Sequence, residues 1–494
     1  MRTLALLLLT AVLTAGCAQT STISTTPPAA SGPALTSISD YESMKTAIDT
    51  LFADTLFPPA FAGIKVIHLR TGKVLYSLNP DHLFNPASNE KLFTAATALR
   101  TIGPGALLTT VVTADSANRT IGLKGMGDPL LSTADMESLA TLTAAALPDI
   151  PSWLLKGDAS YFDDLYWGDG WTWDGEPESY AMFVTPLMLN SNAIEVSVRG
   201  SSTAGQPPEV SLDPPTKLLG IENTAVSVGT GDSIRNRLEI SRRWKERSNT
   251  VTVTGEIPAG RTRSASLSVW KPDLFATQLF AGMLRARGVR VDLAWVDTVA
   301  VPGVEVARVS HTLDSAVIYM NKVSDNLSAE ALMKGSAAVR WRERGSTGRG
   351  IDILKEILTE AGVDTNSMRA VDGSGLSRYD LTTASAVSGL LVAMYNDSLR
   401  FPTFYASLPI AGVDGTIDRR MRGTPAERNL RAKTGTLNGV TALSGYVRTA
   451  DGEMLAFSML MQNFLSGSTP YRNVQDRIGA LLAGMKLRDI LEDG

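Results

Sequence analysis

The stretch that decides the fold reads NPASNEKLFTAATAL, residues 85–99, and it carries a serine and a lysine three positions apart. A proline just ahead of apolar residues with helical spacing predicts that a helix begins here. Ser88 and Lys91 then project from one face of this helix, within hydrogen-bond reach of each other. Free backbone N–H groups at the helix N-terminus favour a negatively charged oxygen beside Ser88. The segment therefore offers a nucleophile, a base and half of an oxyanion hole.

A Ser-x-x-Lys pair alone is weak evidence, because it occurs about once by chance in a chain of this length. Two further motifs follow it. SDN, residues 324–326, heads a helical segment, and its simple alternative explanation is a helix cap. KTGT, residues 433–436, precedes a hairpin; it is either an ordinary strand end or a strand whose glycine lets another backbone, such as a peptide substrate, approach closely.

Composition narrows the remaining chemistry. The chain has 494 residues, with 46 Lys+Arg against 50 Asp+Glu, three His and one Cys. This length fits roughly two to three domains with sizeable cores. A net charge of −4 without a basic block argues against nucleic-acid binding. Because His68, His82 and His311 are scattered and the Cys is single, we expect no metal site, no cofactor and no intramolecular disulfide.

Other common catalytic motifs are missing from the sequence. No serine is flanked as G-x-S-x-G, so an α/β-hydrolase elbow has no candidate. The Gly-x-Gly pairs complete neither a dinucleotide-binding motif nor a P-loop, and we interpret them as turns. A serine activated by a lysine remains the best candidate for catalysis.

The first residues predict export. Met1-Arg2 precedes an apolar run over residues 4–15, as in a signal peptide. The run ends in LTAGC, residues 13–17, which resembles the lipobox of bacterial lipoproteins; the alternative is ordinary cleavage after Ala18. We expect residues 1–16 to be a signal peptide and 17–40 a flexible tether lipidated on Cys17. The protein would then be periplasmic and anchored to a membrane.

Two hairpins are predicted near the ends of the folded region. Residues 64–69 and 74–78 are β-rich runs about a Thr-Gly turn, and residues 440–449 and 453–461 flank an Ala-Asp-Gly turn. Residues 471–487 then have helical period.

The middle of the chain changes texture. Between residues 112 and 302, short alternating runs broken by Pro and Gly indicate a β-rich insertion. Residues 313–399 are mostly helical, and no internal segment is apolar enough to span a membrane.

Taken together, the three motifs match the triplet typical of class A β-lactamases and penicillin-binding proteins. Ser88 and Ser324 lie far apart (324 − 88 = 236 positions), whereas class A β-lactamases have a much shorter separation. The chain therefore resembles the class C low-molecular-mass penicillin-binding proteins, the D-Ala-D-Ala carboxypeptidase/endopeptidase family of the penicillin-binding protein 4 type. Further similar stretches are GMGDP (125–129), YFD (161–163), GWTW (170–173), NSN (190–192), DGSGLSR (372–378), LPIAG (408–412) and DGT (414–416).

The resemblance implies an α+β fold of the penicillin-binding-protein/serine β-lactamase-like transpeptidase type. An antiparallel sheet flanked by helices would be built from residues 41–112 and 303–494, with strands from both ends in one sheet. Residues 113–302 would form an inserted domain, with a smaller domain nested near residues 200–265.

The resemblance also implies a mechanism. Ser88 would attack the carbonyl of the penultimate D-Ala of a peptidoglycan stem peptide and form an acyl-enzyme that water later hydrolyses. Lys91 must be neutral to accept the serine proton, and burial beside a second cation, Lys433, would lower its pKa. Ser324 would relay the proton to the leaving nitrogen, and Asn326 would hydrogen-bond the peptide amide.

Substrate binding follows from the same resemblance. Lys433, with Thr434, Gly435 and Thr436, would hold the terminal carboxylate, and the backbone N–H groups of Ser88 and Thr436 would form the oxyanion hole. β-Lactams would acylate Ser88 because they mimic D-Ala-D-Ala. The sequence identifies no dedicated deacylation base, so fast β-lactam turnover is not expected.

A separate set of residues is a candidate pocket for the stem-peptide side chain: Trp171, Trp173, Asp174 and Arg378. Four of the eight Trp lie between residues 153 and 173, so an aromatic core of the inserted domain is the alternative explanation. Arg378 would equally fit a structural ion pair.

Two other functions stay open at this point. One is a serine esterase or β-lactamase on the same fold, and the other is a peptidoglycan-binding protein without catalysis. The intact serine, lysine and asparagine positions of the three motifs argue against the second. The sequence does not distinguish carboxypeptidase from endopeptidase activity and does not define the oligomeric state.

Overall fold

The computed structural model of the chain describes residues 41–52, 57, 60–465 and 467–487. The predicted signal peptide, Cys17 and the predicted tether lie outside the described residues. Within the described part of the chain, no helix is long and apolar enough to cross a membrane.

A five-stranded antiparallel sheet joins the two ends of the chain, as predicted. Both predicted hairpins are present, and the N-terminal hairpin pairs with the C-terminal one, with Ile64 opposite Met459. Both strands of the C-terminal hairpin are almost entirely buried, because helices cover both faces of the sheet. In spatial order the strands are β16 (Arg431–Leu437), β17 (Val440–Arg448), β18 (Met454–Gln462), β1 (Phe61–His68) and β2 (Val74–Leu78).

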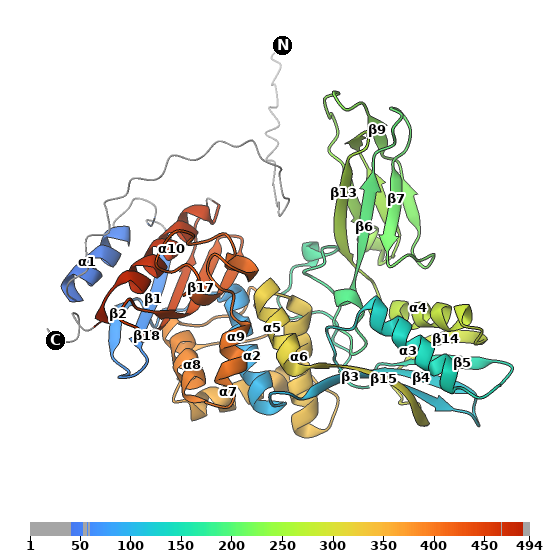
Figure 1. Cartoon of the computed structure of the whole chain (residues 1–494), viewed down its shortest axis with the longest axis horizontal. Coiled ribbons are helices and arrows are strands. Elements are labelled where there is room, and N and C mark those ends of the chain that lie inside the picture. Colours follow the sequence, from blue (N-terminus) through green and yellow to red (C-terminus); the bar gives the residue numbers. More distant parts are fainter. Residues whose placement is uncertain (1–40, 53–56, 58–59, 466, 488–494) are drawn as a thin grey trace, which may run out of the picture. The chain divides into compact units, whose positions relative to one another are not determined.

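Helices lie on both sides of this sheet (Figure 1), and its alternating side chains pack into two different cores. Leu443 and Phe457 face a layer made by α1 (Tyr41–Phe52) and α10 (Thr469–Gly484). Tyr446 faces the opposite layer. That layer contains α2 (Glu90–Thr101), α5 (Leu313–Val323), α6 (Asn326–Trp341), α7 (Thr347–Glu360), α8 (Ala384–Asn396) and α9 (Phe401–Ser407).

The segment between these halves is β-rich, as predicted, and contains a second five-stranded sheet of mixed direction. Two helices, α3 (Thr133–Ala146) and α4 (Pro272–Ala286), pack on it. A capping box at Ser132 starts α3, and a proline at its first turn starts α4. In spatial order the strands are β14 (Val291–Asp297), β5 (Trp153–Asp158), β4 (Thr120–Gly125), β3 (Leu107–Asp115) and β15 (Val304–Thr312).

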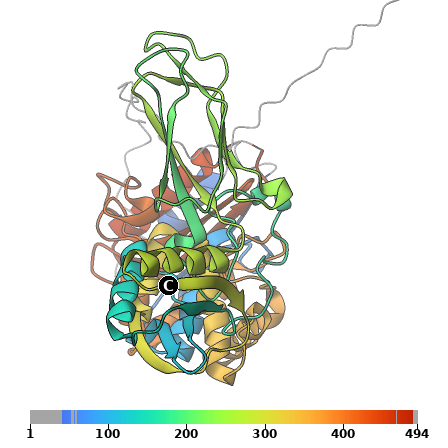
Figure 2. The same cartoon turned by 90° about the vertical axis from the view of Figure 1, so that its right-hand side faces the viewer.

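Eight short strands, which precede α4 in the chain, form a lobe that is drawn upright in green in Figure 1 and seen from the side in Figure 2. They are β6 (Ala193–Arg199), β7 (Glu209–Asp213), β8 (Ile221–Asn223), β9 (Val226–Val228), β10 (Glu239–Arg242), β11 (Val251–Thr254), β12 (Glu256–Pro258) and β13 (Thr262–Ser268).

The predicted domain boundaries at 112/113 and 302/303 fall within β3 and just ahead of β15. These two strands pair with each other and both belong to the sheet of the inserted segment. The division into domains remains a prediction.

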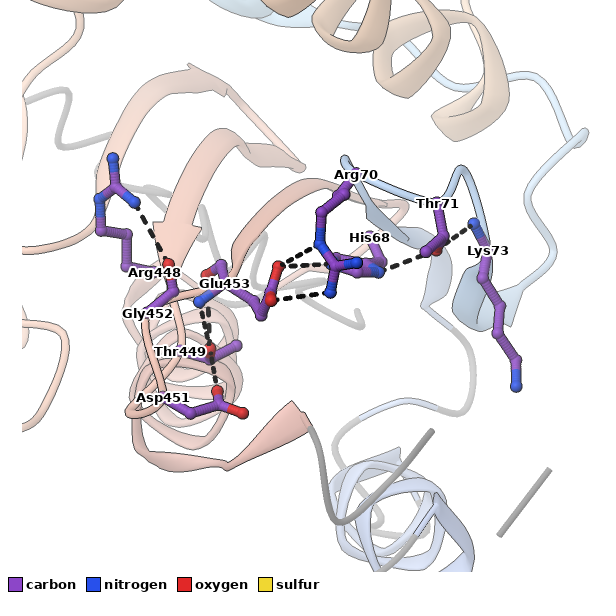
Figure 3. A network of polar contacts seen from close by, with 9 residues as sticks. All are labelled: His68, Arg70, Thr71, Lys73, Arg448, Thr449, Asp451, Gly452 and Glu453. Atoms are coloured by element: carbon purple, nitrogen blue, oxygen red, sulfur yellow. Dashed lines mark hydrogen bonds and ion pairs between the residues drawn. The ribbon is translucent and has the colours of Figure 1, made fainter. Parts of the chain in front are cut away.

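A network of hydrogen bonds and ion pairs connects the turns of the two hairpins in the sheet that joins the chain ends (Figure 3). Glu453, after the β17–β18 turn, accepts hydrogen bonds from Arg70 (2.8 Å) and from Nε2 of the buried His68 (2.9 Å). The other ring nitrogen of His68 contacts the Thr71 hydroxyl at 2.8 Å. The hydrogen bonds from Arg70 and His68 lower the pKa of Glu453 to about 2. The network therefore joins residues from opposite ends of the chain.

Candidate active site

Ser88 and Lys91 meet as the sequence predicts. Ser88 lies in a 3₁₀ turn, η1 (Ala87–Asn89), which leads directly into α2. The Lys91 Nζ contacts Ser88 Oγ at 3.0 Å, and it also contacts Asn326 Oδ1 and the Ser374 carbonyl, both at 2.6 Å. Lys91 is fully buried, whereas Ser88 is partly exposed. The lysine thus lies beneath a serine that a substrate can reach.

The turn that presents Ser88 is held from several sides. Ala87 has a positive φ of 45°, which a non-glycine residue adopts only when its surroundings impose it. The Asn85 side chain accepts the Ala87 N–H (2.9 Å) and donates to the Ser377 and Asp380 carbonyls. The structure therefore fixes the serine turn through an asparagine three positions before it.

Two glycines make room for this turn. A Cβ at Gly375 would lie 1.8 Å from the Ala87 carbonyl oxygen, and one at Gly435 would lie 2.7 Å from that of Pro86. We interpreted Gly435 from the sequence as an approach point for a substrate backbone. The backbone that approaches it here is the protein's own, so packing of the serine turn is sufficient reason for this glycine.

The second motif joins two helices at the site. Ser324 ends α5 in a left-handed conformation (φ 64°), and Asp325 caps α6 by accepting the Ser328 N–H at 2.7 Å. The cap explanation is thus correct for Asp325. Asn326 accepts from Lys91 and donates to the Tyr180 carbonyl at 2.8 Å, so it connects the lysine to the inserted segment.

The third motif lies on β16, the edge strand of the sheet. Lys433 is fully buried, and its Nζ donates to Ser324 Oγ at 2.8 Å and to the Thr434 carbonyl at 2.9 Å. Thr434 and Thr436 contact Thr416 (2.7 Å) and Arg472 (3.0 Å) through their hydroxyl groups. Arg472, near the start of α10, was not predicted, because no local motif marks it.

Burial lowers the pKa of both lysines. The pKa of Lys91 is lowered to about 8 by burial, against the opposing effect of nearby carboxyl groups, above all Asp372. The pKa of Lys433 lies well below its usual value because of burial and then the charge of Lys91. The sequence-based explanation assigned part of the Lys91 shift to Lys433; here burial is the dominant cause.

Sequence reasoning missed a cluster of four buried carboxyl groups: Asp372, Glu330 and Glu90 act on Lys91, and Asp380 acts on Asp372 and Glu90. Burial and then the charge of Asp372 raise the pKa of Glu90, Glu330 and Asp380. Among the described residues, Glu90 Oε1 has no hydrogen-bond partner. Asp372 belongs to DGSGLSR, where the alternation of Gly with Asp and Ser was a turn signal.

Asp372 organises a tight loop. Its carboxylate accepts the backbone N–H groups of Ser374 (3.1 Å), Gly375 (2.6 Å) and Ser377 (2.8 Å). It also accepts the Trp171 indole N–H at 2.8 Å. This loop presents the Ser374 carbonyl to Lys91 and places Gly375 against the serine turn.

The four residues of the candidate side-chain pocket occupy different surroundings. Trp171 is buried in an aromatic and aliphatic cluster, in agreement with the aromatic-core explanation. Trp173 is 70% exposed and lies against Trp244, with ring centroids 5.3 Å apart. Asp174 and Arg378 are exposed, and Arg378 donates to the Asn438 carbonyl at 3.0 Å.

Among the described residues, no three His, Cys, Asp or Glu side chains are grouped so that they could hold a metal ion.

A serine–lysine turn leading into a helix, packed against the edge strand of a five-stranded antiparallel sheet, defines a penicillin-binding-protein or serine β-lactamase-like enzyme. Residues 44–485 match the D-Ala-D-Ala carboxypeptidase 3 (S13) family, and the chain belongs to this family. It is thus a serine-type D,D-peptidase, as its resemblance predicted.

Known relatives agree with this membership. The chain is 36% identical over 467 residues to a D-alanyl-D-alanine carboxypeptidase of Actinomadura sp. (strain R39), covering 89% of this chain and 84% of the relative. It is 25% identical over 473 residues to the D-alanyl-D-alanine carboxypeptidase DacB of Haemophilus influenzae, covering 86% and 94%. The crystal structure of penicillin binding protein 4 (dacB) from H. influenzae has the same fold, with a TM-score of 0.78, 22% identity, and coverage of 88% and 99%.

Proposed function

We propose that Ser88 is the nucleophile with which this chain cleaves the D-Ala-D-Ala end or a D-Ala cross-link of a peptidoglycan stem peptide. The observation that carries the proposal is the 3.0 Å contact between Lys91 Nζ and Ser88 Oγ, on a lysine buried enough to lose its proton near neutral pH. The family relationship supports the substrate class.

The hydrogen bonds of Lys91 explain how it acts as a base. A neutral amine has two N–H donors and one lone pair. The two short contacts, to Asn326 Oδ1 and the Ser374 carbonyl, take both donors because these acceptors cannot donate. The lone pair is then left for the Ser88 hydroxyl proton, and the serine oxygen becomes free to attack.

Ser88, Lys91 and Ser324 account for every bond and proton that changes in the acylation step. Ser88 Oγ bonds to the carbonyl carbon of the penultimate D-Ala while its proton passes to Lys91. The tetrahedral intermediate then collapses, the C–N bond breaks, and the leaving nitrogen takes a proton relayed through Ser324. Ser324 Oγ accepts from Lys433, which orients its own proton away from that lysine. Water later hydrolyses the acyl-enzyme.

The carboxylate end of the substrate has a binding site of the expected chemistry. Lys433 supplies an amine, and the Thr436 hydroxyl, which accepts from Arg472, supplies a donor on an edge strand that is open to a peptide. The Thr434 hydroxyl donates to Thr416 and adds a polar group beside them. We assign the oxyanion hole to the backbone N–H groups of Ser88 and Thr436, and the amide contact to Asn326.

Penicillin tests the nucleophile. Intact mass spectrometry of the full chain after incubation with penicillin should show one penicilloyl adduct in the wild type and none in Ser88→Ala. H. influenzae penicillin binding protein 4 has itself been crystallised in complex with a β-lactam. An unmodified wild type would exclude Ser88 as the proposed nucleophile.

Substrate comparison separates the remaining alternative, an esterase or β-lactamase on this fold. We expect measurable turnover of a D-Ala-D-Ala peptide and slow release of the penicilloyl group. Faster turnover of a nitrophenyl ester or a β-lactam than of the peptide would favour the alternative.

We also propose that the protein is periplasmic and anchored through acylated Cys17. The LTAGC stretch after an apolar run supports this, and one chain of CH₂ groups contributes about 0.8 kcal/mol per buried CH₂. The wild type should fractionate with membranes and Cys17→Ala should not. Equal fractionation of the two would contradict the anchor.

A further inference from the structure

The segment from Leu165 to Tyr180 exposes an unusual amount of large apolar surface. Trp173 is 70% exposed, Tyr180 52%, Leu165 50% and Tyr166 38%. Contiguous exposed apolar surface on a soluble protein marks a binding region. The same segment reaches the active site, because the Tyr180 carbonyl accepts a hydrogen bond from Asn326.

Two cavities adjoin this segment, of about 460 Å³ and about 380 Å³, within the size range of ligand pockets. They share the lining residues Tyr166, Phe183 and Trp270, so they lie next to each other, and we call the two together the aromatic cleft. It contains five of the eight tryptophans of the chain. Its principal aromatic residues are Tyr166, Trp167, Trp173, Trp244, Trp270 and Trp295.

The aromatic cleft is bordered by two separate parts of the inserted segment. Trp173 comes from the exposed segment, and Trp244 comes from the short 3₁₀ helix η4 (Trp244–Glu246) in the lobe. Their rings are tilted by 36° with centroids 5.3 Å apart. Trp173 is 70% exposed and Trp244 is partly exposed, so neither ring fills a core, and Trp173 is the more accessible of the two.

Basic side chains outnumber acidic ones in the lining of the cleft, three to two. Arg247 lies over the Trp270 ring at 4.8 Å, and Lys245 lies over that of Trp244 at 5.4 Å. Lys271 is exposed on the rim. Of the acidic groups, Glu176 is ion-paired with Arg242, and burial raises the pKa of Asp273.

We propose that the aromatic cleft binds the peptidoglycan polymer away from the scissile bond, stacking sugar rings of the glycan strand on its tryptophans. The C–H groups on one face of a pyranose ring are weakly positive and apolar, which suits the negative face of an indole. Lys245, Arg247 and Lys271 complement the carboxylates of stem peptides attached to the same strand. This assignment depends on the proposed function only for the identity of the polymer.

Such a site changes how the enzyme meets its substrate. A glycan strand held in the cleft keeps stem peptides at high local concentration near Ser88, as in any two-site attachment. The cleft should therefore affect activity on polymeric peptidoglycan and leave reactions of small acyl donors unchanged.

The experiment measures binding of full-length Ser88→Ala protein to insoluble peptidoglycan by sedimentation. Adding Trp173→Ala together with Trp244→Ala should weaken binding at least tenfold, and Arg247→Glu should weaken it further. Trp341→Ala is the matched control, because Trp341 lies on α6 against Arg349 and outside the cleft. Unchanged binding by the double variant would overturn the proposal.

A second measurement distinguishes a loss of binding at the cleft from misfolding or a loss of catalysis. With Ser88 intact, penicillin acylation should be the same for the wild type, Trp341→Ala and Trp244→Ala. Because Trp173 is highly exposed, Trp173→Ala alone keeps the test valid if the double variant misfolds. If penicillin fails to acylate the wild type, the proposed function is wrong. The sedimentation result still decides whether the aromatic cleft binds peptidoglycan, because it does not depend on acylation.

Two ligand preparations identify what the cleft recognises. Glycan strands stripped of their stem peptides should retain tryptophan-dependent binding, and free stem peptides should not. Binding of free stem peptides that depends on Trp173 and Trp244, without binding of stripped glycan, would overturn the assignment to sugar rings.

Discussion

The indole N–H of Trp171 donates a 2.8 Å hydrogen bond to the carboxylate of Asp372, and this contact joins the inserted segment to the loop that supports Lys91. The same carboxylate fixes three backbone N–H groups of that loop. The loop in turn presents the Ser374 carbonyl to Lys91 at 2.6 Å. Asp372 therefore positions Lys91 through the loop that it holds, with Trp171 fixing its carboxylate from the inserted segment.

Asp372→Asn should slow acylation by penicillin at least tenfold, because an amide places N–H donors against the N–H groups that the carboxylate accepts. It should also move the pH midpoint of acylation downward, since the negative charge of Asp372 raises the pKa of Lys91. Stopped-flow acylation measured against pH checks both effects. Trp171→Phe, which keeps the charge, should leave the midpoint in place, and an equal shift in both variants would contradict this explanation.

The wild type should acylate faster as pH rises. Only neutral Lys91 accepts the Ser88 proton, and burial lowers its pKa to about 8. The rate should therefore rise about tenfold per pH unit well below pH 8 and level off above it. A rate constant for penicillin acylation that stays flat between pH 5 and 9 would be inconsistent with Lys91 as the base.

Gly375→Ala should abolish acylation, because the new Cβ would lie 1.8 Å from the Ala87 carbonyl and displace the serine turn. Gly105→Ala is the matched control. Gly105 has a similar φ (74° against 76°), but nothing lies within 4 Å of its Cβ position. The control should lose some stability and keep the acylation rate, as seen by mass spectrometry and thermal unfolding. Equal loss of activity in both would show that backbone strain alone matters.

Lys433→Ala should weaken catalysis most for substrates that carry a free terminal carboxylate. We expect the ratio of kcat/KM between a D-Ala-D-Ala peptide and its C-terminal amide to fall about tenfold or more. Comparing both substrates in both proteins provides the measurement. The Lys433 role would be wrong if the variant lowered kcat/KM equally for the two.

Glu453→Gln should reduce stability at neutral pH and not at low pH. The pKa of Glu453 in the folded protein is about 2, below its ordinary value near 4.5. Its stabilising contribution is therefore complete above about pH 4.5 and disappears as the pH falls towards 2. Thermal unfolding should show a loss of about 1–3 °C at pH 7 that vanishes near pH 2.

Glu360→Gln provides the comparison for this experiment. Glu360 forms an exposed ion pair with Arg100 at 2.9 Å, and we expect a smaller effect from its loss. A Glu453→Gln effect independent of pH would mean that the carboxylate charge contributes nothing.

The elements that could be predicted are those that depend on near neighbours. The Ser88–Lys91 contact follows from spacing on one helical turn, and the two hairpins follow from alternation about short turns. The helix and strand types around residues 324–326 and 433–436 could also be predicted from neighbouring residues alone. Boundaries were less certain: the helix predicted for residues 471–487 ends at Gly484, where Met485 adopts an extended conformation.

Surroundings were harder to predict than elements. Nothing in GWTW distinguishes a buried Trp171 from an exposed Trp173, since both belong to one short irregular stretch. Nor does any local pattern bring Glu330 close to Lys91, or Arg472 beside Thr436. These neighbours come from different helices and loops.

The sequence by itself indicated the candidate nucleophile, the three motifs and the family resemblance, because each depends on residue types at short spacings along one element. Tertiary structure decided the chemistry of those residues. Lys91 has a lowered pKa because folding removes it from water and gives it acceptors from Asn326 and Ser374, more than 230 positions away. Desolvation and long-range contacts exist only in the packed chain, and they give a common pair of residues the properties that the proposed base and nucleophile require.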